Sequence, residues 1–482
     1  MAEVALAMIF SAGGLETADD DHLRCVKVNL PENITAALEQ RKLYRHCEEI
    51  ECDESLLEDV VANYVIVKKI LGFIPWQEKF ISKQVCTMWK SVVTTLQKEI
   101  AGPIDFALSM RPSHIKNGIN LLQSECFFAP PMAVFAFANA GGFSATGRCE
   151  AMIKCPCDPP CDKEHYILDV LKTQMVVPRE CMIAVKACYT SFLPLPGSIA
   201  NRHAIGQRFG RYSPFIGGIF IPVIPHVKFE VINIKRLGDI QKVFMKTVDK
   251  LSETHYVKGA LVFVSSSFIL QSMDDIIFLN YLASLQPKVP YALGGCIVDD
   301  ALADGEDMTA MVQGINAGRE VTTDNLINVA LFSVPKNFDD IRTEGGNFDM
   351  FSIILESSDW SKSKMETAIN DFSQKVPHFE HSVVVKMSCV GRDSKHDYEQ
   401  NFFRTAFPNS PLVGCYGNGE LGINLPERGE SGDRPAMKRN RPSVHRGQGL
   451  GLMYSYATVF VYIGWGKIIR PAETTNKPDA MQ

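Results

Sequence analysis

The chain has 482 residues, of which 46% are hydrophobic, so it is long enough for about three domains with ordinary apolar cores. Its 49 basic and 55 acidic side chains give a net charge of −6, which excludes a protein that binds nucleic acid mainly through charge. The start of the chain lacks the basic residues of a secretory signal, and the apolar stretch 452–465 is too short for a membrane span. With 14 cysteines as free thiols, we expect a cytoplasmic or nuclear protein without membrane contact.

Residues 1–54 are predicted to form a loosely ordered lead-in, because they combine an acidic patch with only one helix-like stretch. From 55 to 98, apolar residues recur at helical spacing, and Pro75 separates two such sets. Three short helices with about 40 residues in total cannot bury their own apolar faces. The segment therefore either packs on the rest of the chain or needs a partner protein.

Within this segment, Ile70–Pro75 runs as two aliphatic residues, a small residue, an aromatic residue, an aliphatic residue and proline. Val85 and Cys86 follow, and Trp89 lies three residues after the cysteine. The pattern resembles the F-box family, although Ala62-Asn63 replaces the Leu-Pro that opens many F-boxes. The resemblance implies helix-in-groove docking to a Skp adaptor. The residues that it assigns to this contact are Ile70, Leu71, Ile74, Pro75, Val85, Cys86 and Trp89.

From about residue 113 onward, apolar runs with β-forming composition alternate with amphipathic helical stretches. Strands are expected at 132–138, 181–187, 214–224, 228–234, 260–266, 291–298, 327–334, 350–357, 381–390, 411–417 and 456–464. Helices are expected near 236–253, 272–285, 361–375 and 394–406. Because several strands follow one another without a helix, we predict an α+β fold with large mixed or antiparallel sheets and flanking helices. A boundary near Pro222 and Pro225 divides the predicted regions 113–225 and 226–470, and a tail spans 471–482.

The stretch Gly417–Gly422 matches the G-x-G-x-x-G pattern of a dinucleotide-binding loop. Such a loop requires a helix directly after the glycines, since the helix N-terminus holds the pyrophosphate. Here the following residues contain three prolines and show no helical period, and the acidic ribose partner is missing. The glycines therefore indicate a tight turn between two strands.

This stretch also lies inside LVGCYGNGELG (412–422), which resembles the signature of the FIST C-terminal domain, a ligand-sensing module. Residues 292–296 with Asp299, then 387–392, 406–414 and 455–467, agree with that family in order. F-box and FIST resemblances together cover about 55–470, with the F-box at 55–98.

The combination implies a non-catalytic substrate receptor of an SCF-type ubiquitin ligase. The F-box would bind the Skp adaptor, which joins the cullin scaffold and the RING subunit, and the FIST body would capture the protein to be ubiquitinated. One alternative is a sensor whose FIST pocket binds a small molecule. An enzyme is disfavoured, because no Ser/His/Asp order, H-E-x-x-H or P-loop occurs.

If the FIST body has a pocket, the glycine-bearing strand ends should line it, since glycine lets a ligand approach the backbone. Arg392 would then pair with a ligand carboxylate or, alternatively, with Glu420. Cys389 either has a lowered pKa that makes it reactive or is an inert core residue. The candidate pocket residues are Gly294, Gly295, Cys389, Arg392, Asn418, Gly419 and Glu420.

Four cysteines cluster in GRCEAMIKCPCDPPCDKEH, namely Cys149, Cys155, Cys157 and Cys161. Four thiolates can close a tetrahedral zinc site, but the spacing is not that of paired C-x-x-C knuckles, so a surface loop is the alternative. The polar segment 427–449 carries a basic patch at 438–441, which suits a nuclear import signal or a disordered insertion.

Overall fold

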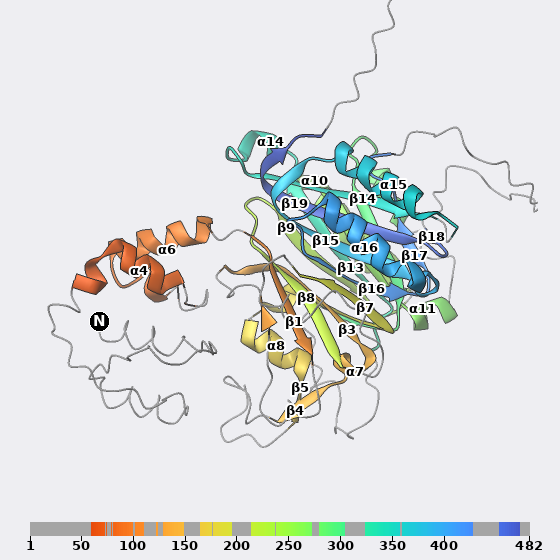
Figure 1. The fold of residues 1–482 in the computed structure, drawn as a ribbon, viewed down its shortest axis with the longest axis horizontal. Helices are drawn as coiled ribbons and strands as arrows, with labels where there is room; N and C mark the ends of the chain where they lie inside the picture. The colour runs from red at the N-terminus through yellow and green to blue at the C-terminus, as the bar shows by residue number, and fades with distance from the viewer. Residues whose placement is uncertain are drawn as a thin grey trace, which may run out of the picture. The chain divides into compact units, whose positions relative to one another are not determined.

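The computed structural model describes a large part of the chain, and these residues form two compact units. The helical unit includes Met1–Ala101, and the α/β body comprises Gly102–Ser124 and Pro131–Gln482 (Figure 1). No helix among the described residues has the length and apolar character needed to cross a membrane. The described residues are 59–72, 74, 79, 81–99, 102–109, 122–123, 129–148, 164–175, 177–194, 214–236, 238–271, 279–303, 323–356, 359–427 and 453–472.

The helical unit contains α4 (Tyr64–Gly72) and α6 (Thr87–Glu99), which lie against each other. Helix α4 begins where it does because the Asn63 side chain accepts hydrogen bonds from the backbone N–H groups of Val65 and Ile66. The unit has its own small apolar core, and the Trp89 indole N–H donates to the Val61 carbonyl at 3.2 Å. The buried core residues are Val67, Leu71, Ile74, Trp89, Val92, Val93 and Leu96.

The body contains three large mixed sheets, which confirms the predicted α+β class with mixed sheets. The first sheet has the order β12-β6-β3-β8-β1-β2, the second β18-β17-β11-β10-β13-β9 and the third β14-β19-β15-β16-β7. The strands of the first sheet are β1 (Ile104–Ser109), β2 (Leu122–Gln123), β3 (Pro131–Asn139), β6 (Met182–Ala187), β8 (Phe215–Pro222) and β12 (Asp300–Leu302). Those of the second are β9 (Lys228–Ile234), β10 (His255–Ser265), β11 (Ala292–Val298), β13 (Ile327–Pro335), β17 (Glu420–Gly422) and β18 (Met453–Tyr454). Those of the third are β7 (Tyr189–Leu193), β14 (Asn347–Leu355), β15 (His378–Cys389), β16 (Leu412–Gly417) and β19 (Thr458–Arg470).

One four-strand unit occurs three times in succession. In each repeat the strands stand in the order third, second, fourth, first; the second and third strands are parallel, and the other neighbours are antiparallel. The pairing register is also the same, because Ala138↔Ile216, Val264↔Ile327 and Ser388↔Thr458 occupy equivalent positions. Repeat 1 consists of β1, β3, β6 and β8, repeat 2 of β9, β10, β11 and β13, and repeat 3 of β14, β15, β16 and β19.

The repeats are joined in a ring by short strands that follow each third strand. Strand β7 of repeat 1 pairs with β16, β12 of repeat 2 with β6, and β17 of repeat 3 with β11. The register is equivalent here too, with Thr190↔Cys415, Ala301↔Val185 and Glu420↔Cys296. The boundary predicted near Pro222 and Pro225 therefore lies at the junction of repeats 1 and 2, inside one compact unit.

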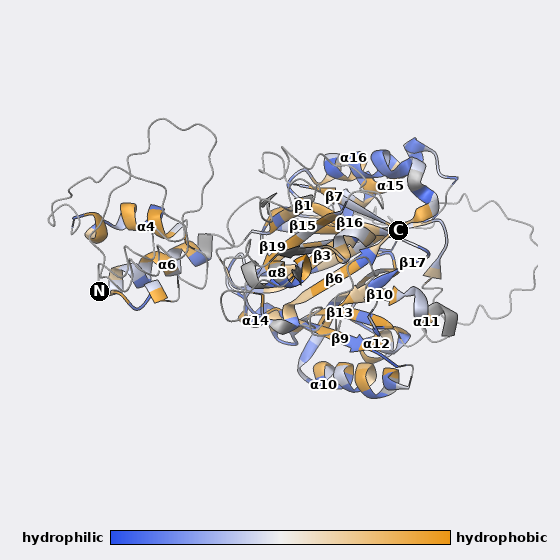
Figure 2. Ribbon diagram, turned by 90° about the horizontal axis from the view of Figure 1, so that it is seen from below, coloured by the Kyte–Doolittle hydropathy of each residue, from blue (hydrophilic) through white to orange (hydrophobic). Residues whose placement is uncertain are grey.

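A helix precedes the third strand of every repeat: α8 (Ile167–Met175), α12 (Asn280–Leu285) and α16 (His396–Ala406). Further helices, α10 (Lys246–Thr254) and α15 (Lys362–Lys375), precede the second strands of repeats 2 and 3. Helix α15 buries Met365, Ile369 and Phe372, and Ser361 caps its first turn. In Figure 2 the central strands are largely hydrophobic, whereas hydrophilic residues predominate on α15 and α16. These two helices correspond to those predicted at 361–375 and 394–406.

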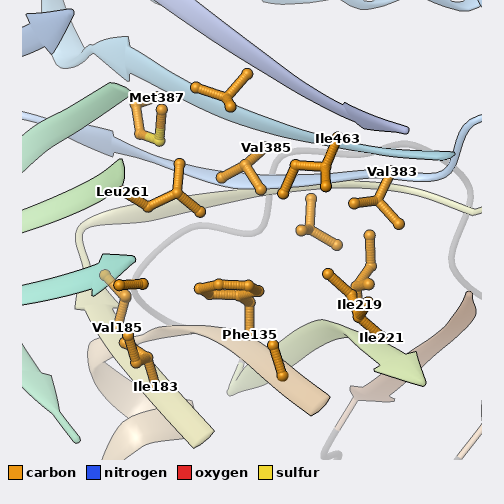
Figure 3. Packing of buried hydrophobic residues seen from close by; sticks show 14 of the residues in the cluster. Phe135, Ile183, Val185, Ile219, Ile221, Leu261, Val383, Val385, Met387 and Ile463 are labelled. Carbon is orange, nitrogen blue, oxygen red and sulfur yellow. The ribbon is translucent and has the colours of Figure 1, made fainter. Parts of the chain in front are cut away.

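The main core lies where the inner faces of the three sheets meet. The side chains of Phe135, Leu261 and Val385, which occupy equivalent positions in the three repeats, belong to one buried cluster. Figure 3 shows these residues pointing into the shared interior, together with neighbours such as Ile219 and Met387. Burial of this apolar surface is the main favourable term that holds the sheets together.

Candidate functional site

The helical unit divides the residues assigned to the Skp contact between its interior and its surface. Leu71, Ile74 and Trp89 are buried in the core of the unit, whereas Ile70 and Val85 are half-buried and Cys86 is exposed. Pro75 lies outside the described residues. Other apolar side chains, here called the exposed row, are exposed instead, three in succession at the start of α4 and one after it: Tyr64, Val65, Ile66 and Ile81, with Val65 64% exposed. Sequence reasoning missed this row because helical spacing alone does not say which apolar residues a small unit turns inward.

The glycines of Gly417–Gly422 make a strand-to-strand crossover, as predicted. Strand β16 ends at Gly417, and β17 begins at Glu420, with no helix in the described residues that follow, up to 427. A Cβ at Gly417 would lie 2.4 Å from the Ile297 carbonyl oxygen, and Gly419 has φ +149°, so both positions require glycine. The Asn418 N–H donates to Ile297 O, and the Ile297 N–H donates to Gly419 O, each at 2.9 Å. This turn brings Glu420 into the sheet of repeat 2.

Beside this crossover, repeat 3 contains a buried network of charged side chains centred on Glu399 of α16. Glu399 Oε1 accepts hydrogen bonds from Arg392 Nε at 3.0 Å and from Arg392 Nη2. Its other oxygen lies 3.5 Å from Lys386 Nζ and accepts from the Thr458 hydroxyl at 2.9 Å. All three charged side chains are fully buried, and the single carboxylate of Glu399 pairs with both cations.

The Lys386 ammonium has further polar neighbours. It lies 3.3 Å from the Tyr416 hydroxyl and 3.5 Å from His396 Nδ1, and Tyr416 and His396 are hydrogen-bonded to each other. Burial lowers the pKa of Lys386, and the attraction of Glu399 opposes this shift. Buried groups with shifted pKa values are frequent at functional sites, which makes this network a candidate.

Two positions of the network are apolar in the other repeats. Lys386 corresponds to Ala136 and Val262, because each lies two residues before the matched pair in its second strand. Similarly, Thr458 corresponds to Ile216 and Ile327. Repeats 1 and 2 therefore lack these two polar groups, although buried Lys186 of repeat 1 occupies the position of Tyr416. Buried ion pairs contribute little to stability, so a functional role of repeat 3 explains the network better than a stabilising role.

Glu420 is the second unusual group near the crossover. It is fully buried, its Oε2 accepts from the Ala457 N–H at 3.1 Å, and among the described residues its Oε1 has no hydrogen-bond partner. Burial raises the pKa of Glu420 to about 8. The guanidinium of Arg392 pairs with Glu399, and its charge also opposes the rise in the pKa of Glu420. A ligand carboxylate at Arg392 would have to compete with the ion pair to Glu399.

The pKa of Cys389 is shifted in the direction opposite to that of a reactive thiolate. Burial and the nearby Glu420 raise it, so the inert alternative fits better. Next to it, Tyr456 has φ +59°, a conformation that is strained for a residue with a side chain. Its carbonyl accepts from Arg392 Nη1 at 2.9 Å, and its ring lies against Gly391. The network thus extends to a strained, partly exposed surface residue.

The remaining predicted pocket residues are packing positions or lie at the surface. Gly294 and Gly295 are packing positions, since a Cβ there would lie 2.3 Å from Val461 Cγ2 and 2.2 Å from Val262 O, respectively. Asn418 is exposed. Of the seven predicted residues, the structure joins Cys389, Arg392 and Glu420 to the charged network.

The possible zinc ligands Cys149, Cys155, Cys157 and Cys161 lie outside the described residues, as do the lead-in 1–54 and the basic patch at 438–441. Within the described part of the chain, no group of at least three His, Cys, Asp or Glu side chains could hold a metal ion.

We expect Glu420→Gln to flatten the pH dependence of stability. Because the carboxyl pKa is about 8 in the folded chain and 4.5 ordinarily, the folded state binds a proton more tightly between these values. The native chain should therefore lose stability as pH rises from about 4.5 to about 8, and the glutamine variant should lack this component. Urea unfolding midpoints of both chains across this range test it, and parallel profiles would contradict it.

Comparison with known proteins adds a distant structural likeness. No protein-family profile and no curated protein matches the chain. Among solved structures, cyanuric acid hydrolase from A. caulinodans is similar over 76% of this chain and 99% of its own, with 8% identity and a TM-score of 0.29. At this TM-score the likeness supports no conclusion about fold or function.

Proposed function

We propose that the chain is the substrate receptor of an SCF-type ubiquitin ligase. The helical unit would bind a Skp adaptor that joins the cullin and RING subunits, and the body would hold the protein to be ubiquitinated. The proposal is carried by the exposed apolar side chains of the helical unit, which is the segment that resembles an F-box. That unit has its own core around Trp89 yet exposes the row Tyr64, Val65, Ile66 and Ile81.

In this role the chain performs no bond chemistry. It raises the effective concentration of a client lysine near the activated ubiquitin by holding both on one assembly. An exposed apolar row on a short helix suits this purpose, because amphipathic helices bind by inserting such residues into a groove. The adaptor contact is accordingly proposed for the exposed row, together with half-buried Ile70 and Val85 and exposed Cys86.

The double variant Val65→Glu, Ile66→Glu is expected to abolish recovery of the Skp adaptor and cullin in co-purification. Loss of two apolar anchors at such contacts weakens binding by about 2 kcal/mol or more. Acidic residues in the first turn of α4 favour the helix, so the unit should stay folded. Ser91→Glu, an exposed polar position on α6, is the matched control. Full adaptor recovery with the double variant would refute this contact.

A second candidate function, a small-molecule sensor, is favoured by Glu420. A buried carboxyl oxygen without a partner suits a site that a polar ligand completes. Native mass spectrometry of the purified chain tests this candidate. A small molecule that is bound to the native chain and absent from Glu420→Ala supports it; a bare chain in both cases argues against it.

A further inference from the structure

The last strand of the body extends beyond its partner. In repeats 1 and 2 the fourth strand ends at a proline, Pro222 or Pro335, and the chain turns into the next repeat. In repeat 3, β19 continues to Arg470, while β14 begins at Asn347, opposite Gly466. No described strand therefore lies beside residues 467–470 on the β14 side. We call these four residues the β19 extension.

The β19 extension is held in place from its other side. Strand β15 pairs with it through Phe379↔Ile468 and His378↔Arg470. The Arg470 guanidinium donates to the carbonyl of Ser373 at 2.7 Å and to its hydroxyl at 2.8 Å. The extension is thus an anchored strand with one unpaired edge. The turn before β14 lies against Lys467, since a Cβ at Gly345 would be 2.9 Å from Lys467 Cγ, so the backbone groups that suit another extended segment are those after Lys467.

Two of the four side chains of the β19 extension are apolar and exposed to solvent. Ile468 is 45% exposed and Ile469 is 64% exposed. Neighbouring residues of a strand point to opposite faces, so an added strand would cover apolar surface on both faces. Exposed aliphatic side chains on an open strand edge are avoided in proteins unless another chain covers them.

The charged side chains of the β19 extension indicate which kind of peptide segment would bind beside it. Lys467 and Arg470 are both exposed, and the acidic neighbour across the ribbon is Glu380, whose carboxylate accepts from the Lys467 N–H at 3.4 Å. The local surplus is therefore cationic. An incoming strand with acidic residues between its aliphatic residues would match both the charge and the isoleucines.

We propose that the β19 extension binds an extended peptide segment of alternating aliphatic and acidic residues, which adds a strand beside residues 468–470. This inference rests on the proposed function, because the segment would belong to the captured client. It locates client binding on repeat 3 of the body. The contact involves none of the residues proposed for the adaptor.

The test uses the full chain and a fluorescent synthetic peptide of about seven alternating Glu and Ile residues, followed by anisotropy. We expect saturable binding, and binding about tenfold weaker or more with Ile469→Glu, a change equivalent to about 1.4 kcal/mol. Val223→Glu is the matched control, since Val223 is 53% exposed in the turn after β8. A peptide with proline at alternate positions should not bind, because proline lacks the amide hydrogen of a paired strand.

Charge reversal separates recognition from a structural effect. Lys467→Glu should weaken binding of the Glu-Ile peptide and favour a Lys-Ile counterpart. Equal binding to Ile469→Glu and the native chain, or no saturable binding up to about 1 mM, would overturn the proposal. A dimer of the chain that Ile469→Glu abolishes would assign the edge to a second copy and likewise overturn it. The peptide assay needs no adaptor, so a failed adaptor co-purification with successful peptide binding would refute only the ligase function.

Discussion

Replacing Trp89 by alanine is expected to unfold the helical unit while the body keeps its structure. Trp89 is 3% exposed and packs with Val67, Leu71 and Val92 in a core of few residues. Truncation of a buried tryptophan costs about 3–5 kcal/mol, which is comparable to the total stability of so small a core. Amide exchange in α4 and α6 should approach that of an unfolded chain, whereas the strands of the body stay protected.

Two controls separate folding from docking. Trp89→Phe keeps most of the apolar volume and should retain partial protection, and Val65→Glu should leave amide exchange in α6 unchanged. If Trp89→Ala kept native protection in both helices and still lost the adaptor, Trp89 would be a docking residue, as the F-box pattern implied. The structure favours a role in the core of the unit.

Replacing Glu399 by alanine is expected to destabilise the body strongly. The substitution leaves the fully buried cations Lys386 and Arg392 without their shared carboxylate. Removal of one partner from a buried ion pair costs about 3–5 kcal/mol, because the remaining charge stays desolvated. Chemical unfolding monitored by a spectroscopic signal of the body measures the loss.

The matched control removes the charges together. The triple variant Lys386→Val, Arg392→Met, Glu399→Leu places the valine of repeat 2 at position 386 and should recover most of the lost stability, since apolar replacements of buried ion networks are often neutral or stabilising. If the triple variant were as unstable as Glu399→Ala, the network would be a structural requirement of repeat 3. A stable triple variant that fails in client or ligand binding would establish a functional role.

Much of the body could be predicted from the sequence because its strands are long apolar runs. The predicted strand at 228–234 coincides with β9, and that at 411–417 differs from β16 by one residue. Of the short strands that join the ring, β7 and β12 were not predicted, and β17 was predicted only as a strand after the glycine turn. Two of them have three residues each, and their stability comes from pairing with another repeat, which local periodicity does not report.

The threefold repetition is also invisible in the residues. Phe135, Leu261 and Val385 are equivalent but share only apolar character, and a core accepts any set that fills its volume. Repeats are recognised from sequence when particular residues recur at a fixed period in every copy, whereas here the equivalent pairs Gly295-Cys296 and Gly414-Cys415 recur only in repeats 2 and 3. The repetition is recognised from the pairing register of the strands.

One residue of the charged network, Lys386, could have been noticed in the sequence. Lys386 stands in the middle of the apolar strand HSVVVKMSCV, where a charge is tolerated only beside a partner. Its partner Glu399 lies 13 positions further on (399 − 386), in a helix whose packing on the strand could not be foreseen. Arg392 and Glu420 were singled out for their motifs, but their actual partners depend on the three-dimensional arrangement.

The ring of short strands has a consequence for fragments of the chain. A fragment that stopped after repeat 2 would lose β16, with which β7 pairs, and β17, which pairs with β11, so β7 would have no neighbour and the second sheet would be incomplete. Because each repeat receives a short strand from another repeat, a single repeat could complete its own sheet only by pairing with further copies of itself.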